Sequence, residues 1–179
     1  MDRVGELAGE LAGTLADLGY APQDAAPDGT GAAAVLAAPR GPNHTLCTVA
    51  ALPNDMTGPD DAVPFVRRLR KALSGRFRGL PKPRRLATYT VLLADHDTYS
   101  RLRTHTGRLI DVGRWHVNVM LGTVLVDVEE FSLRADTTWG LVDTGDQFER
   151  IRRTVETWCR RYRKPRRSIL TGSRRRHVA

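Results

Sequence analysis

Apolar residues recur every three or four positions in four segments of the chain, and this spacing predicts amphipathic helices. The four segments are residues 2–18, about 61–74, about 96–104 and about 145–162. The last helix is the clearest, because Thr144-Gly145-Asp146-Gln147 forms a capping box that satisfies the first free backbone N–H groups. Its predicted buried face consists of Phe148, Ile151, Val155, Trp158, Cys159 and Tyr162.

Short apolar runs rich in β-branched residues predict strands between these helices. The runs are residues 32–38, 45–52, 86–94, 108–112, 115–121 and 123–133. The first two flank a five-residue connection and predict a hairpin, and the third is apolar enough to be a central strand. Gly113 and Gly122 fall at the joins between the last three runs.

The resulting element order is α-β-β-α-β-α-β-β-β-α, in which strands occur in runs and do not alternate strictly with helices. This order predicts a single α+β domain over residues 1–162, with a mostly antiparallel or mixed sheet of about five to six strands and helices packed on one face. Residues 163–179 are polar and basic, and their apolar content is too small for independent folding, so they form a predicted C-terminal tail.

Composition narrows the class of protein. No stretch approaches the ~20 apolar residues that span a bilayer. The first residues lack the features of a secretory signal, which favours a cytoplasmic location. Cys47 and Cys159 both lie in apolar patterns, so we expect buried, inert thiols and neither a disulfide framework nor a zinc site. The sequence therefore predicts no metal and no cofactor.

Charge is distributed unevenly along the chain. Residues 1–64 carry nine acidic and two basic residues, whereas residues 65–179 carry 26 basic and 11 acidic residues, so the local net charges are −7 and +15. Arginine outnumbers lysine 25 to 3, a bias that a GC-rich genome imposes on any protein. The basic excess is thus open to two interpretations, selection for a polyanionic partner or codon bias.

The first candidate site is a basic surface in two parts. The C-terminal part contains nine cations with no acid among them, and each phosphate that such a segment neutralises releases condensed counterions. These residues are Arg160, Arg161, Arg163, Lys164, Arg166, Arg167, Arg174, Arg175 and Arg176. A second group, between Arg67 and Arg85, is the weaker candidate because a charged outer helix face is ordinary.

The second candidate is a group of acids and histidines within 36 residues. Its members are Asp95, His96, Asp97, His105, Asp111, His116, Asp127, Glu129 and Glu130. Alternation along a strand places Asp127 and Glu129 on one face, and with His116 they could hold Mg²⁺ or Mn²⁺ for phosphodiester cleavage. The competing interpretation, which we favour, is that Asp95 and Asp97 cap a helix and that the others lie on a solvated sheet face.

Nucleophile-elbow, phosphate-loop and dinucleotide-binding motifs are absent. The order of elements resembles the general layout of small secretion-chaperone-like domains, and this resemblance implies a protein-binding role. Three hypotheses therefore stand. The first is a non-enzymatic binding module for nucleic acid or another polyanion. The second is an adaptor or chaperone-like module with an acidic protein partner, and the third is a metal-dependent phosphodiesterase with His116, Asp127 and Glu129 as its site.

Overall fold

The structure is a computed structural model of the chain, and it describes residues 3–22, 32–40, 43–76, 85–110, 119–137 and 145–163. Four α-helices and a short 3-10 helix occur in these ranges: α1 (Arg3–Ala16), α2 (Pro59–Arg76), α3 (His96–Leu102), η1 (Thr106–Ile110) and α4 (Gly145–Tyr162). The strands are β1 (Ala21–Pro22), β2 (Ala32–Arg40), β3 (Asn43–Ala51), β4 (Arg85–Ala94), β5 (Val119–Asp127) and β6 (Ser132–Thr137).

The strands form one mixed sheet in which spatial order follows chain order, from β1 to β6. β2 and β3 make the expected antiparallel hairpin, and β6 runs antiparallel to β5. The three central strands β3, β4 and β5 are parallel to one another. Parallel neighbours need a crossover connection, which α2 supplies between β3 and β4, and α3 with η1 between β4 and β5.

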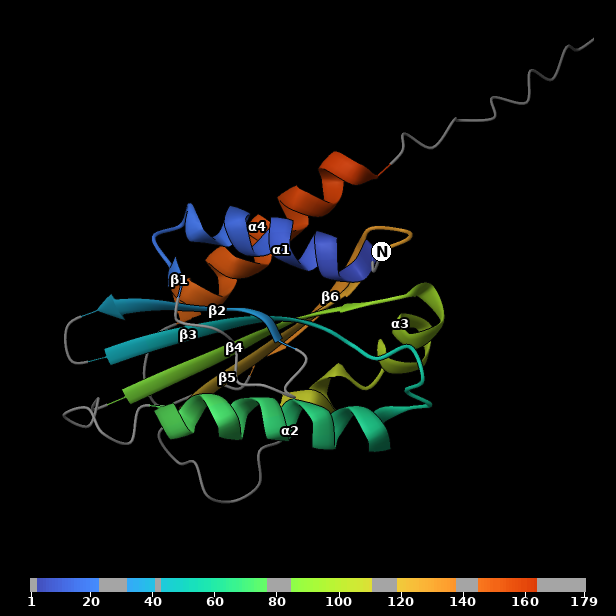
Figure 1. The fold of residues 1–179 in the computed structure, drawn as a ribbon, viewed down its shortest axis with the longest axis horizontal. Coiled ribbons are helices and arrows are strands. Elements are labelled where there is room, and N and C mark those ends of the chain that lie inside the picture. The colour runs from blue at the N-terminus through green and yellow to red at the C-terminus, as the bar shows by residue number, and fades with distance from the viewer. Residues whose placement is uncertain are drawn as a thin grey trace, which may run out of the picture.

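Helices cover both faces of the sheet, as Figure 1 shows, with α1 and α4 on one side and α2 and α3 on the other. The expectation of helices on one face only was therefore wrong. The reason lies in the parallel strands, because two successive crossovers of the same hand place their helices on the same face. The opposite face is then left for the first and last helices of the chain.

Two hydrophobic clusters lie on the two sides of the sheet. Alternate residues of β4 contribute to each: Tyr89, Val91 and Leu93 pack beneath α1 and α4, whereas Leu92 and Ala94 pack against α2 and α3. All five side chains are at most 1% exposed. A strand buried on both faces must be apolar almost throughout, which is why the run 86–94 indicated a central strand.

The last helix agrees with its predicted pattern. Phe148, Ile151, Val155, Trp158 and Cys159 are all buried, whereas Tyr162 at the helix end is 37% exposed. Thr144 of the capping box lies outside the described residues. The amide oxygen of Gln147 accepts a hydrogen bond from the Tyr20 hydroxyl at 3.0 Å.

The strands after residue 105 differ from prediction. Residues 106–110 form the 3-10 helix η1 and not a strand, and residues 111–118 lie outside the described residues. Gly122 does not join two strands but lies inside β5, and Ser132–Thr137 is a separate strand after a tight turn. The coarse prediction of one α+β domain with a mixed sheet is confirmed, and the number and order of strands agree with prediction only in part.

Candidate functional site

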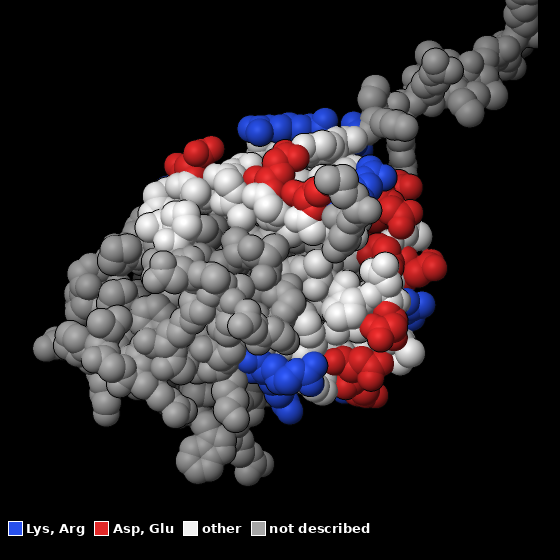
Figure 2. Space-filling view, in the orientation of Figure 1, with Lys and Arg blue, Asp and Glu red and all other residues white. Residues whose placement is uncertain are grey.

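The carboxyl ends of the three parallel strands meet at one edge of the sheet. Figure 2 shows acidic side chains gathered at the end of the molecule where α3 lies in Figure 1. The segments that follow the three strands carry Asp55, Asp60, Asp61, Asp95, Asp97, Glu129 and Glu130. The fold thus brings together acids from both halves of the sequence.

Asp127, the last residue of β5, is the buried member of this edge. Its Oδ1 atom accepts hydrogen bonds from the backbone N–H groups of Glu129 at 2.9 Å and Glu130 at 3.0 Å. These bonds hold the turn between β5 and β6, which closes at Phe131 with a positive φ of 49°. The carboxylate is therefore fixed in orientation, and its second oxygen remains for another partner.

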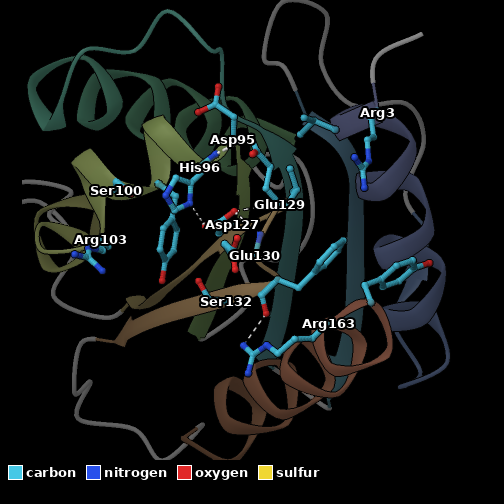
Figure 3. A pocket seen from close by; sticks show the side chains of 15 residues that line it. Arg3, Asp95, His96, Ser100, Arg103, Asp127, Glu129, Glu130, Ser132 and Arg163 are labelled. Atoms are coloured by element: carbon cyan, nitrogen blue, oxygen red, sulfur yellow. Dashed lines mark hydrogen bonds and ion pairs between the residues drawn. The ribbon is translucent and has the colours of Figure 1, made fainter. Parts of the chain in front are cut away.

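That partner is His96, the first residue of α3, whose Nδ1 atom lies 2.7 Å from Oδ2 of Asp127. The imidazole side chain is 51% exposed, whereas the side chain of Asp127 is 1% exposed. The hydrogen bond and the negative charge of Asp127 raise the pKa of His96 above its usual value, and the charges of Glu129 and Glu130 act in the same direction. Figure 3 shows the two side chains pointing toward each other.

The pair lies in an open cleft of about 1280 Å³, larger than the ~300–1,000 Å³ of an ordinary small-molecule pocket. The residues that line it include the acids Asp95, Glu129 and Glu130 and the arginines Arg3 and Arg103. At the far side the cleft reaches the end of α4, where Tyr162 and Arg163 contribute. The lining thus combines both signs of charge around one half-exposed histidine.

The turn that follows Asp127 packs against the end of α4. The ring of Phe131 stacks on Tyr162, with centroids 5.0 Å apart, and meets the edge of Trp158 at 5.8 Å. The guanidinium group of Arg163 donates a hydrogen bond to the carbonyl oxygen of Phe131 at 2.9 Å. The chain therefore leaves the described domain at the rim of the cleft.

The predicted His116, Asp127 and Glu129 constellation is only partly placed by the structure. Asp127 and Glu129 lie together in the cleft, His116 lies outside the described residues, and the histidine on Asp127 is His96. No group of three His, Cys, Asp or Glu side chains suited to a metal ion occurs within the described ranges. His96 follows the central strand β4, and Asp127 ends β5. Had β4 and β5 been predicted as parallel neighbours, the sequence would have indicated that these two residues lie close together.

The structure describes three of the nine C-terminal cations. Arg160 pairs with Glu156 at 2.7 Å, Arg161 is exposed, and Arg163 is exposed while it binds Phe131. The remaining six lie outside the described residues: Lys164, Arg166, Arg167, Arg174, Arg175 and Arg176. Earlier in α4, Arg152 and Arg153 both bind Glu149, whose pKa they lower to about 2. These ion pairs offset most of the positive charge in the middle of α4.

One arginine of the second basic group is buried in the core and does not face solvent. Arg68 is exposed on α2, whereas Arg70 is only 6% exposed. Its guanidinium group donates to the carbonyl oxygen of Leu109 and to the hydroxyls of Thr90 and Thr123. Burial lowers the pKa of Arg70 to about 10, so the group stays charged at neutral pH. Arg70 therefore holds α2 on the sheet and is not available to a polyanion.

Cys47 and Cys159 are free and buried, and burial raises the pKa of each thiol to about 12. No helix within the described ranges is long and apolar enough to cross a membrane. Comparisons of the chain with protein-family models, with characterised proteins and with solved structures found no match. Function must therefore be argued from the residues themselves.

Proposed function

We propose that this protein binds nucleic acid or another polyanion through the end of α4 and the residues that follow it. The single observation that carries the proposal is the nine-cation run from Arg160 to Arg176, which contains no acid and leaves the domain at an exposed helix end. Each phosphate contact by such a run releases counterions, and this release makes binding favourable and dependent on salt.

The ion pairs of α4 support this location within the chain. Arg152, Arg153 and Arg160 are held by Glu149 and Glu156, so their charges are already partly compensated. The cations without an acidic partner on α4 therefore lie mainly beyond Arg160 in the sequence, and a polyanion would interact most favourably with them.

The salt dependence of nucleic-acid binding tests the proposal. Deleting residues 164–179 removes six cations, so the slope of log K against log salt on duplex DNA should fall by up to about 5, at about 0.9 per phosphate contact. Fluorescence anisotropy between 50 and 300 mM salt measures this slope. Arg163 is retained because of its bond to Phe131, and the truncated domain should keep its melting temperature.

Two controls make the result specific. A full-length variant with all six cations changed to Gln should behave like the deletion, whereas Arg153→Gln should leave the slope unchanged because Glu149 already pairs that arginine. Competition with heparin, single-stranded nucleic acid and an acidic protein separates the nucleic-acid hypothesis from the adaptor hypothesis. Failure of the full-length protein to bind any nucleic acid at the lowest salt would overturn the proposal.

A further inference from the structure

We infer that the cleft at the carboxyl edge is a catalytic site that cleaves RNA by proton transfer at His96. The inference rests on the proposed function, since it assigns a chemistry to the polyanion that the C-terminal run binds. It starts from the contact between His96 and the buried carboxylate of Asp127, which are 2.7 Å apart. It depends equally on the position of this pair in an open cleft, where the His96 side chain is half exposed.

Asp127 gives the histidine a defined proton arrangement. An ionised carboxylate only accepts hydrogen bonds, so the neutral imidazole donates its Nδ1–H to Asp127 and keeps an unprotonated Nε2. Two backbone N–H groups fix Oδ1 of the same carboxylate, and the hydrogen bonds therefore determine the position of the ring. A half-exposed imidazole oriented by a buried carboxylate is the arrangement that proton-transferring histidines require.

RNA is the phosphodiester suited to such a site because it carries its own nucleophile. Nε2 of His96 takes the proton of a ribose 2′-hydroxyl, and the 2′-oxygen forms a bond to the adjacent phosphorus. The bond between phosphorus and the 5′-oxygen of the next nucleotide breaks, and the imidazolium returns its proton to that oxygen. The products are a 2′,3′-cyclic phosphate and a free 5′-hydroxyl, and the histidine ends in its starting state, so no further reactant is needed.

The end of α4 connects this chemistry to binding. Arg163 lines the cleft and binds the turn that carries Asp127, so an RNA strand held by the following cations begins at the rim of the site. Arg3 and Arg103 also line this cleft. The charged groups that act on His96 are Asp127, Glu129 and Glu130, and together they favour its protonated form.

In this assignment His96 is the catalytic residue and Asp127 is a positioning residue. The base must be neutral, so log(kcat/KM) should rise with pH and reach a plateau above the pKa of His96. Asp127→Asn removes the charge that raises this pKa, and the midpoint of the profile should therefore move to lower pH while the rate falls. A purely structural role for Asp127 would lower the rate without moving the midpoint.

The experiment uses the full-length protein, a fluorescent single-stranded RNA and EDTA in the buffer. His96→Ala should lower the cleavage rate by at least about 100-fold, the lower end of what a general acid–base group contributes. His105→Ala is the matched histidine control and should cleave like the original protein. The new ends should be 2′,3′-cyclic phosphates, and neither DNA nor 2′-O-methyl RNA should be cut, because neither has a free 2′-hydroxyl.

Binding measured in parallel distinguishes this inference from the proposed function. RNA binding without cleavage overturns the inference alone, and so does cleavage that survives His96→Ala. Absence of binding overturns the proposed function as well. Should Asp127→Asn fail to fold, His96→Ala and His96→Gln still decide the question, because the side chain they change is half exposed.

Discussion

At the scale of single residues, Gly122 shows how a side chain is excluded by its neighbours. A Cβ atom at this position would lie 2.5 Å from the ring of Phe148 and 2.9 Å from the ring of Tyr89. The backbone of β5 is thus in direct contact with the first turn of α4. The sequence shows a glycine at this position, but glycine is also common where two strands join. Only the packing against Phe148 and Tyr89 explains why a side chain is excluded here.

Gly122→Ala should destabilise the protein by about 1–3 kcal/mol, because the added methyl group overpacks the contact with Phe148. Gly13→Ala is the matched control, since nothing lies within 4 Å of its Cβ position and alanine favours helix. Urea unfolding measures both free energies. Equal stability of Gly122→Ala and the original protein would contradict the packing described here.

Arg70 is a second residue whose structural role could not be predicted from the sequence. Four cations follow one another closely from Arg67 to Lys71, and the pattern suggested that all of them face solvent. In the structure the Arg70 guanidinium lies beneath α2 and bridges η1, β4 and β5. Among the described residues, the Nε atom of Arg70 and the hydroxyl of Thr48 are buried without a hydrogen-bond partner.

Arg70→Ala should cost about 2–4 kcal/mol, because it opens a cavity and removes the donor to the Leu109 carbonyl. The neighbouring exposed Arg68→Ala should stay within about 0.5 kcal/mol of the original stability. Thermal and urea unfolding compare the two variants. If both arginines prove equally dispensable, Arg70 does not bridge these elements.

At the scale of elements, the helices were the more predictable part. Their apolar stripes have a period that no strand shares, and the structure places helices close to the predicted ranges. The strands after residue 105 were less predictable, since short apolar runs occur in strands and in buried 3-10 turns alike.

Helix α4 is the element on which one side of the core depends. Trp158 is fully buried against Phe131, and its indole N–H donates to Glu10 of α1 at 3.1 Å. Trp158→Ala should therefore cost about 3–5 kcal/mol. Thr157→Ala, on the exposed side of the same helix, is the control and should be nearly neutral. An unchanged melting midpoint for Trp158→Ala would contradict the burial of this helix.

At the scale of the whole molecule, the fold rearranges the charges of the sequence. Along the chain, residues 1–64 carry a net charge of −7 and residues 65–179 a net charge of +15. In space, acids from both parts meet at the carboxyl edge of the parallel strands, as Figure 2 shows at the α3 end. Three of the five cations of α4, Arg152, Arg153 and Arg160, are paired with acids of the same helix. Net charge alone therefore overstates the basic surface of the described domain.

The sequence by itself determined the α+β class, the helices and the acid-free basic run, because these depend on period and composition, which are local. The tertiary structure decided that β3, β4 and β5 are parallel and that helices cover both faces. It also placed His96 on the buried carboxylate of Asp127, 31 positions along the chain. Such a contact depends on which strands are neighbours and in which direction they run. That choice is made by packing over the whole chain, which no local pattern records.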